Sequence, residues 1–528
     1  MENALPAYDN NGVDKKTLWR VITASSVGTV IEWYDFYIFG SLAVIIGAQY
    51  FPKGENPLIQ TIEALALFAT GFVVRPFGAL FFGRLGDLIG RKYTFLVTLM
   101  LMGGSTFAIA FVPGYESIGI AAPLILLVLR LLQGLALGGE YGGATTYVAE
   151  HAPDKHRGYY TSFIQLTATV GLFLSILVIL ACRLNMDSES FNSWGWRVPF
   201  GLSGILVIFS YFIRKNMHES PLFAKLKAEG NISKNPLKES FTNKENLKMV
   251  LLALFGITAG QGCVWYTGQF YAQGFIGNIL NVEFVTTNII VAVAVLLATP
   301  FYIVFGGLSD KVGRKKIMML GLLLAVINYY PIYRKMDSVV DYSHKEIASS
   351  SSKTSLTTSP DGKSQIQSVK DEKIFTDGSK VTVTTATAIN NSTVTKAQKP
   401  EVKTVVEITS QAKYWLIFLV FIQVIFVTMV YGPVAAFLVE LFPTKIRYTS
   451  MSLPYHIGNG IFGGLTPLIA TSVVVATGDK FAGLYYPLAV ALITLIIGTL
   501  FIKDKRNVKI MEDEENEPEL AVNESRRM

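Results

Sequence analysis

Long apolar segments alternate with short polar or charged segments from about residue 19 to residue 502. Most of the apolar segments reach the roughly 20 residues that an α-helix needs to cross the hydrocarbon core of a bilayer. The pattern therefore predicts twelve membrane-spanning helices. We expect them at residues 19–48, 61–83, 93–113, 120–149, 157–182, 196–215, 248–279, 285–307, 316–333, 412–440, 448–477 and 482–502.

A polar linker at residues 216–247 divides these helices into two groups of six. The predicted fold class is an all-α integral membrane protein with two pseudo-symmetric bundles, at residues 19–215 and 248–502. Lys and Arg concentrate in the short loops on one side, which we take to be the cytoplasm. Both ends of the chain, residues 1–18 and 503–528, and the linker are expected on that side, in the inner membrane of a bacterium.

Two short charged segments occur at matching places in both halves. Gly83–Lys92 (GRLGDLIGRK) recurs as Gly306–Lys315 (GGLSDKVGRK), and Glu150–Arg157 (EHAPDKHR) recurs as Glu440–Arg447 (ELFPTKIR). Each copy lies between long apolar segments, so the repeated unit is a bundle of membrane helices. This arrangement is typical of a transporter.

The spacing of these repeats reveals an insertion in the second half. Gly83 and Glu150 are 67 positions apart, whereas Gly306 and Glu440 are 134 positions apart. The additional residues lie at 335–410, which the helix count places outside the cell, between helices nine and ten.

The insertion is rich in Ser, Thr, Lys and Val. Its first part, Ser349–Ser355, has a composition typical of disorder. Lys380–Thr385 and Lys403–Thr409 alternate with a period near two, which favours a small hairpin with a turn at Asp377–Ser379 or Asn390–Ser392. The sequence leaves open whether this hairpin forms or the segment is disordered.

The composition agrees with a membrane protein and excludes several other classes. Hydrophobic residues make up 51% of the chain and charged residues 16%, and the mean hydropathy is +0.41. The two cysteines, Cys182 and Cys263, exclude a disulfide framework and argue against a cysteine metal site. The loop bias accounts for the net charge of +7, so no nucleic-acid partner is expected.

Several motifs resemble those of the major facilitator superfamily. Gly83–Lys92 resembles the turn between helices two and three of that superfamily, and Arg130–Gly134 (RLLQG) resembles a second signature found in proton-coupled members. Glu32–Phe36 (EWYDF), Arg75–Gly78 (RPFG) and Gly138–Tyr141 (GGEY) resemble the metabolite:proton symporter family. The resemblance implies transport of carboxylates, proline or betaines by proteins that commonly act as monomers.

A proton symporter needs a protonatable group inside the membrane, where a buried charge is costly unless it is paired, hydrated or functional. Glu32 and Asp35 lie three positions apart on one face of helix one. Two carboxylates that close in a low dielectric do not both ionise easily, so one of them is a candidate proton carrier. Glu140 on helix four is the third candidate. No cofactor is expected, and the proton is the coupling ion.

Two arginines at depth are candidate substrate ligands. Arg75 lies in helix two, and Arg130 shares a stripe of helix four with Gln133 and Glu140. A guanidinium suits a carboxylate, which favours a mono- or dicarboxylate substrate. Alternatively, the arginines form structural ion pairs with Asp35 and Glu140 and never touch substrate. Neutralisation by Glu32, Asp35 and Glu140 would instead leave a site for a zwitterion such as a betaine.

Polar and aromatic residues on helices seven and eleven complete the candidate site. Glutamine, tryptophan and tyrosine side chains at helical spacing can line a cavity with hydrogen-bonding groups and ring faces. Packing of these rings, and a His456 that is merely hydrogen-bonded, are the competing interpretations. The candidates are Gln261, Trp265, Tyr266, Gln269, Tyr455, His456 and Asn459.

The repeated turns are expected to control conformation. Asp87 and Asp310 can each pair with their own Arg, Arg91 or Arg314, and with a neighbouring helix end, which would latch one state of the transporter. Glu150 with Arg157, and Glu440 with Arg447, are expected to pair in the same way. Alternatively, these charges only set the topology.

Other functions fit the sequence less well. The chain lacks a phosphate-binding Walker loop, a metal-ligand cluster and a nucleophile elbow, so we expect no enzyme. Within transport, uniport and sugar transport remain alternatives, because Glu219–Pro221 also occurs in sugar porters. A nutrient sensor that uses residues 335–410 for signalling is a remote alternative.

Overall fold

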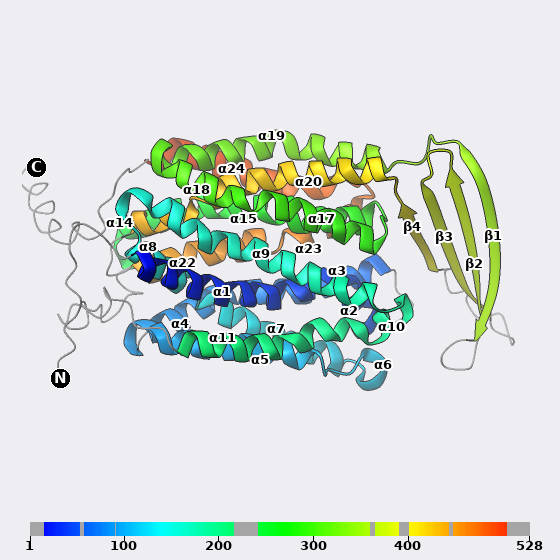
Figure 1. The fold of residues 1–528 in the computed structure, drawn as a ribbon, viewed down its shortest axis with the longest axis horizontal. Helices are drawn as coiled ribbons and strands as arrows, with labels where there is room; N and C mark the ends of the chain where they lie inside the picture. The colour runs from blue at the N-terminus through cyan, green and yellow to red at the C-terminus, as the bar shows by residue number, and fades with distance from the viewer. Residues whose placement is uncertain are drawn as a thin grey trace, which may run out of the picture.

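The computed structural model describes residues 15–52, 57–89, 91–215, 241–358, 365–389, 401–442 and 447–503. Long helices lie side by side, and a small sheet projects beyond one end of them (Figure 1). We call that end the sheet end, and the opposite end the turn end. Residues 1–14, 216–240 and 504–528, which belong to predicted cytoplasmic segments, lie outside the described residues.

The first half of the chain contains long helices joined by short ones. The helices are α1 (Lys15–Ser41), α2 (Ala43–Tyr50), α3 (Pro57–Val73), α4 (Arg75–Ile89), α5 (Arg91–Ile109), α6 (Tyr115–Ile118), α7 (Ala121–Gly138), α8 (Tyr141–His151), α9 (Arg157–Leu184), α10 (Ser188–Ser193) and α11 (Val198–Lys215). Two 3₁₀ turns, η1 (Asp154–His156) and η2 (Gly195–Arg197), precede α9 and α11.

The second half contains more interrupted helices. They are α14 (Lys244–Ala253), α15 (Ala259–Trp265), α16 (Ala272–Gly274), α17 (Phe284–Ala298), α18 (Pro300–Val312), α19 (Arg314–Val340), α20 (Ser410–Tyr431), α21 (Val434–Leu441), α22 (Arg447–His456), α23 (Thr466–Thr477) and α24 (Tyr485–Phe501). The π-helical segments η3 (Leu254–Thr258), η4 (Tyr266–Tyr271), η5 (Phe275–Ile279) and η6 (Ile457–Gly463) and the 3₁₀ turn η7 (Ala482–Leu484) join some of them.

The predicted all-α membrane fold is confirmed, with the sheet as an addition. Among the described residues, ten helical segments are long and apolar enough to span a bilayer, and the pair Ile22–Ser41 and Ala43–Tyr50, bent by 60°, is an eleventh candidate. The predicted span 93–113 corresponds to α5, whose apolar part, Leu96–Ile109, falls short of the length of a full span. The predicted count of twelve therefore depends on α5.

Interruptions in the apolar helices place irregular backbone inside the bundle. Gly432 and Pro433 separate α20 from α21, because proline has no N–H to continue the helical ladder. The segment from α14 to η5 contains three π-helical turns, and η6 forms a fourth after α22. Such turns in transporters occur where backbone and side chains line a binding site.

The insertion forms a four-stranded antiparallel sheet. Strands β1 (Ile347–Thr358), β2 (Gln365–Phe375), β3 (Lys380–Ile389) and β4 (Glu401–Glu407) lie in the order β1-β2-β3-β4. The predicted pairing of Lys380–Thr385 with Lys403–Thr409 is confirmed, with Lys380 opposite Glu407 and Thr384 opposite Lys403. Asp377–Ser379 forms the turn between β2 and β3, where Gly378 has a φ of 84°. The alternative turn at Asn390–Ser392 lies outside the described residues.

The prediction of disorder at Ser349–Ser355 is wrong. These residues form most of β1 and pair with β2, with Ser352 opposite Asp371. The local composition gave no sign of this strand because its partner edge comes from another segment. The ends of the insertion also differ from the prediction. α19 continues to Val340 and α20 begins at Ser410, so the insertion spans residues 341–409.

The sheet is attached to the second half of the chain. The N–H of Val406 donates to the carbonyl of Asn281 at 2.8 Å, and the N–H of Glu283 donates to the carbonyl of Val406 at 3.0 Å. α19 and α20 provide the two covalent connections. The sheet therefore moves together with the helices of residues 244–503.

Candidate functional site

Arg75 lies at the start of α4 with 1% of its surface exposed. Its guanidinium carbon is 5.1 Å from the ring centroid of Trp33, 4.4 Å from that of Phe36 and 4.2 Å from that of Phe72. Among the described residues, no hydrogen-bond acceptor contacts its Nε or Nη2. The buried cation is therefore stabilised mainly by ring faces, and two of its donors are available for a ligand.

Close packing of α4 against α7 fixes this position. A Cβ atom on Gly138 would lie 2.1 Å from the carbonyl oxygen of Arg75, so only glycine permits this approach. The motifs at 75–78 and 138–141 thus meet in space. They hold the backbone on which the guanidinium is carried.

Arg130 is enclosed within the first half of the chain. Its Nη1 donates to Gln133 Oε1 at 2.6 Å, and its Nη2 donates to the carbonyl of Phe68 at 3.3 Å. Its guanidinium carbon is 4.3 Å from the ring centroid of Phe36, so that ring contacts both arginines. Gln133 in turn donates to Thr106 at 2.6 Å. Arg130 and Gln133 are a packed pair. Among the described residues, only Nε of Arg130 has no hydrogen-bond partner, whereas Nε and Nη2 of Arg75 both have none.

The alternative in which both arginines form ion pairs with Asp35 and Glu140 is wrong. None of the ion pairs among the described residues includes Arg75 or Arg130. The physical reason is that aromatic rings occupy the positions around both guanidiniums. The sequence places these rings at 33, 36, 68 and 72 but does not show which way they point.

Three of the predicted residues around η4 contact the first half of the chain. Trp265 stacks on Tyr37 with ring centroids 5.4 Å apart, and Tyr266 packs edge-on against Phe72 at 5.3 Å. Gln269 accepts a hydrogen bond from Thr169 at 3.2 Å. These residues therefore lie at the boundary between the halves, as a site for alternating access requires.

Gln261 differs from these three residues because its hydrogen bond lies within the second half of the chain. Its Oε1 accepts a hydrogen bond from Asn459 at 2.7 Å, within the second half. Its Nε2 contacts no hydrogen-bond acceptor in the described part of the chain, and neither does Nε1 of Trp265. Both atoms are buried donors, like those of Arg75.

A second cluster at the boundary surrounds Tyr455. Its ring stacks on Tyr141 with centroids 3.4 Å apart and an interplanar angle of 2°, and its hydroxyl lies 2.5 Å from that of Tyr431. Tyr141 donates to Gln165 at 3.0 Å, and Gln165 donates to the carbonyl of Tyr431 at 3.0 Å. This cluster joins the two halves by stacking and by hydrogen bonds.

His456 is buried beside the same cluster. Its ring lies 6.4 Å from that of Tyr141 and 5.3 Å from that of Tyr455, edge-on to both. Neither ring nitrogen has a hydrogen-bond partner among the described residues. The ring nevertheless faces the backbone of Gly138, so the interpretation of His456 as merely hydrogen-bonded stays a prediction.

All three candidate proton carriers are buried, with 1% of Glu32, 1% of Asp35 and 2% of Glu140 exposed. Asp35 points into the first half of the chain. Its Oδ2 lies 3.3 Å from the position that a Cβ on Gly103 of α5 would occupy, and its Oδ1 has no hydrogen-bond partner in the described residues.

Two positions along a helix correspond to about 200° of rotation. Asp35 and the rings of Trp33 and Tyr37 are therefore on opposite faces of α1.

Asp310 joins the halves at the turn end. Its carboxylate accepts hydrogen bonds from the backbone N–H of Gly158 at 2.8 Å and of Tyr159 at 2.9 Å, in the first turn of α9. Arg314 also donates to it, at 2.5 Å. A carboxylate at a helix N-terminus is stabilised by the unpaired N–H groups and by the helix dipole. The predicted pairing of Asp310 with its own arginine and with a neighbouring helix end is confirmed.

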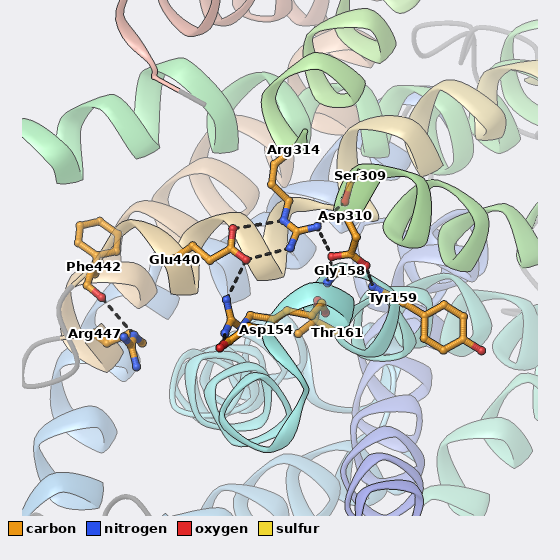
Figure 2. A network of polar contacts seen from close by, with 11 residues as sticks. Asp154, Gly158, Tyr159, Thr161, Ser309, Asp310, Arg314, Glu440, Phe442 and Arg447 are labelled. Atoms are coloured by element: carbon orange, nitrogen blue, oxygen red, sulfur yellow. Dashed lines mark hydrogen bonds and ion pairs between the residues drawn. The ribbon is translucent and has the colours of Figure 1, made fainter. Parts of the chain in front are cut away.

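Glu440 is the second acceptor at this end (Figure 2). Its Oε1 accepts from Arg314 Nη2 at 2.8 Å and from Arg157 Nη1 at 3.0 Å, and its Oε2 accepts from Arg314 Nε at 3.3 Å. Arg157 also pairs with Asp154. One buried carboxylate thus bridges an arginine from each half.

The predicted pairing of Glu440 with Arg447 is wrong. Arg447 Nε donates to the carbonyl of Phe442 at 3.1 Å, whereas Glu440 binds the arginines of α9 and α19. The halves pack against each other here, so a partner from the other half is closer than the one seven positions along. The side chains of Asp87, Arg91 and Glu150 lie outside the described residues.

The chain matches known proteins over nearly its whole length. A family model described as "Sugar (and other) transporter" matches residues 21–231. The inner membrane metabolite transport protein YhjE of Escherichia coli is 31% identical over 486 residues, which cover 90% of this chain and 92% of that protein. The chain belongs to the major facilitator superfamily. It is a multi-pass membrane transporter and not an enzyme.

Two further relatives of this transporter and one solved structure are informative. The alpha-ketoglutarate permease of Escherichia coli is 27% identical, with 94% of this chain and 96% of that protein covered. A Staphylococcus haemolyticus protein named for proline and betaine transport is also 27% identical, with 92% and 88% covered. The proton:xylose symporter XylE has the same fold, with a TM-score of 0.68 and 14% identity over 95% of this chain and 99% of that one.

The sequence interpretation missed several residues of this transporter's boundary. The predicted residues are surrounded by rings that the sequence interpretation did not single out, those of Trp33, Phe36, Tyr37, Phe72 and Tyr141. Thr169 and Tyr302 hydrogen-bond to Gln269, Tyr431 to Tyr455, and Gln165 joins Tyr141 to Tyr431. The spacing of 33, 36 and 37 puts three rings on one face of α1, and that was the available signal. The remaining residues of this set carry no such signal in the sequence, because aromatic and small polar residues are common throughout the apolar segments.

Proposed function

We propose that this transporter is a proton-coupled symporter of small carboxylates that works by alternating access. The observation that carries the proposal is the guanidinium of Arg75. It lies at the boundary of the halves, 1% exposed, with two donors that have no partner among the described residues. A carboxylate can accept two parallel hydrogen bonds from such a group.

Two further buried donors, which like those of Arg75 have no partner among the described residues, support an anionic substrate. Gln261 Nε2 and Trp265 Nε1 are, like the arginine nitrogens, donors only. Leaving buried donors without acceptors costs about 1–3 kcal/mol each. An acceptor-rich substrate such as a carboxylate removes that cost, whereas a cationic group close to Arg75 is repelled.

We assign proton uptake to Asp35 first, with Glu32 and Glu140 as the other candidates. Asp35 is buried on the face of α1 opposite to Trp33 and Tyr37. α1 thus carries the proton carrier on one face and part of the substrate site on the other. Protonation can therefore act on the substrate site through the packing of one helix. Arg75, Trp265, Tyr266, Gln269 and His456 are the proposed substrate contacts, and Gln261, Tyr455 and Asn459 hold the adjoining surface.

The membrane and its orientation are part of the proposal. The relatives are bacterial, and one is named as an inner membrane protein, so we place this chain in a bacterial plasma membrane. The charged turns would face the cytoplasm and the sheet the outside. The ion pairs of Asp310 and Glu440 would then close the cytoplasmic face in this conformation. We expect the transporter to act as a monomer, with no partner other than lipid, metabolite and proton.

A zwitterionic substrate is the second candidate. The relative named for proline and betaine transport favours it, and aromatic rings around the site can bind a quaternary ammonium. Sugar transport is supported only by a family model that covers sugar and other transporters and by a fold shared at 14% identity. Uniport and a sensor function have no observation in their favour among the described residues.

Binding measurements on the purified protein separate these candidates. We expect alpha-ketoglutarate or another small carboxylate to bind the intact protein, with affinity reduced about 100-fold in Arg75→Gln, because two charge-assisted hydrogen bonds are lost. Arg334→Gln is the matched control, since Arg334 lies 5.6 Å from the ring of Phe481, near the sheet end. Tight binding of betaine or xylose that is unchanged in Arg75→Gln would reject the carboxylate assignment.

A further inference from the structure

Parallel ring stacks join the two halves of the transporter. Tyr37 lies against Trp265 with centroids 5.4 Å apart and planes at 16°, and Phe68 lies against Phe270 at 5.2 Å and 11°. In each pair, one ring belongs to the helices of residues 15–215 and the other to those of residues 244–503. The flat faces of these rings are therefore the surfaces that meet when the halves close.

The stack at Tyr37 leads directly to the arginine. Trp33 stacks on Tyr37 with centroids 5.2 Å apart and planes at 13°, and the guanidinium of Arg75 is 5.1 Å from the Trp33 ring. From the other side, Phe72 touches both Arg75, at 4.2 Å, and Tyr266, at 5.3 Å. The interface between Tyr37 and Trp265 is thus one ring away from Arg75 Nε and Nη2, which have no partner in the described part of the chain.

Alternating access requires the two halves to separate here, and this step loses the Tyr37–Trp265 stack. We propose that the substrate is a planar, conjugated carboxylate whose flat body enters between Tyr37 and Trp265 while its carboxylate binds Arg75. This inference rests on the proposed function and specifies its substrate class. A planar body regains a ring contact on each of its faces, so the separated halves close on it.

A saturated body does not fit this slot equally well. It is thicker than a planar ring and presents C–H groups instead of a π face, so it recovers burial but not stacking. Ring stacking adds to the effect of burial, and for two contacts the addition corresponds to roughly five- to 140-fold in affinity. Trp265 Nε1, which has no partner among the described residues, can in addition donate to an acceptor on the edge of the planar body.

The test compares three probes of similar size on the intact protein in lipid nanodiscs. Benzoate and cyclohexanecarboxylate share the carboxylate and differ in planarity, whereas benzamide is planar and uncharged. We expect benzoate to bind about tenfold more tightly than cyclohexanecarboxylate, and benzamide to bind at least about tenfold more weakly than benzoate. Each affinity can be read from calorimetry or from the ligand-dependent rise in unfolding temperature.

Each outcome separates the inference from the proposed function. Equal binding of benzoate and cyclohexanecarboxylate overturns the planar slot and leaves the carboxylate proposal standing. Equal binding of benzamide and benzoate overturns the arginine as the anchor. If neither benzoate nor cyclohexanecarboxylate binds while alpha-ketoglutarate does, the planar slot is overturned and the carboxylate proposal stands; if alpha-ketoglutarate also fails to bind, the proposed function is overturned.

Variants of the two rings then test the location. We expect Tyr37→Leu and Trp265→Leu to reduce the preference for benzoate to about twofold or less, and Tyr37→Phe to keep it, because phenylalanine retains the ring face. Trp415→Leu is the matched control, since Trp415 is 44% exposed in the second turn of α20. A full preference for benzoate in both leucine variants would place the slot elsewhere and overturn this assignment.

Discussion

The guanidinium of Arg157 donates to the carboxylate of Glu440 at 3.0 Å, although the two residues are 283 positions apart. Glu440 also binds Arg314, and Asp310 binds the start of α9. The turn end of the transporter is thus held closed by buried charges from both halves. A closure of this kind can be opened and reformed, because its bonds depend on a few side chains.

Removing the carboxylate at 440 should weaken this closure. Breaking a buried ion pair by removing one partner costs about 3–5 kcal/mol, because the other charge remains buried. We therefore expect Glu440→Gln to shift the transporter toward the state that is open at the turn end. Spin-label distances between α9 and α18 measure the shift, and a longer distance is the expected result.

Asp154 supplies the control for this variant. It also pairs with Arg157, but its side chain is 40% exposed and it belongs to the same half. Surface pairs contribute about 0–1 kcal/mol, so Asp154→Asn should leave the distances nearly unchanged. Equal shifts in both variants would show that Glu440 has no special part in the closure.

Gly306 and Gly307 allow a steric test of the same closure. A Cβ on Gly306 would lie 2.6 Å from the carbonyl oxygen of Gly158, across the boundary of the halves, whereas one on Gly307 meets nothing closer than 3.4 Å. We expect Gly306→Ala to prevent full closure and to reduce uptake at least about tenfold, since overpacking costs about 1–3 kcal/mol. Gly307→Ala should transport normally. Uptake by proteoliposomes that contain equal amounts of each variant checks this, and normal uptake by Gly306→Ala would contradict it.

The surroundings of Asp35 can be probed through Gly103. A Cβ at this position would lie 1.7 Å from Val207 Cγ2 and 3.3 Å from Asp35 Oδ2, whereas one on Gly104 has nothing within 4 Å. Gly103→Ala combined with Val207→Ala removes the contact with Cγ2, leaves Cβ of residue 207 at 3.1 Å, and places a methyl group beside the carboxylate. We expect this double variant to transport with an altered pH profile, because the new methyl group changes the solvation of Asp35. An unchanged profile, equal to that of Gly104→Ala, would argue against Asp35 as the proton carrier.

The turn between β2 and β3 gives a pH prediction outside the membrane. Although burial opposes ionisation of Asp377, hydrogen bonds from Lys345 and Ser379 hold its pKa at about 2. Because this pKa lies below the value of about 3.9 expected in an unfolded chain, the contribution of Asp377 to the stability of the turn is present above about pH 4 and is lost as the pH falls toward 2.

Hydrogen exchange at the amides of Gly378 and Ser379, corrected for intrinsic rates, measures this effect. We expect protection at about pH 5 and its loss near about pH 2.5 in the intact protein, and little protection at either pH in Asp377→Asn. Asp341→Asn is the control, because Asp341 bonds to Ser343 at the end of α19. Strong protection in Asp377→Asn would contradict the assignment.

The sequence predicted those features that depend on local pattern. The apolar segments predicted the helices, and the repeated motif predicted the pairing of Asp310 with Arg314. The alternation at 380–385 and 403–409 predicted two strands of the sheet. Arg314 lies one helical turn from Asp310, and each of the two strands has its own alternation of side chains, so these pairings can be seen in the sequence.

Features that depend on packing between distant segments were not predictable. Glu440 was expected to bind Arg447, which is close in sequence, but it binds Arg157 from the other half. One of the two interpretations of Arg75 paired it with an acid, whereas it lies among aromatic rings. Both results follow from how the two halves fit together, which no single segment of the sequence contains.

Proton movement by proteoliposomes on addition of a carboxylate is the most direct test of the account. We predict that a transported carboxylate makes the outer medium more alkaline as protons enter with it. Asp35→Asn should abolish this change while still exchanging labelled substrate across the membrane. If the carboxylate is transported without any proton movement by the intact protein, the transporter is a facilitator and the proposed coupling through Asp35 is wrong.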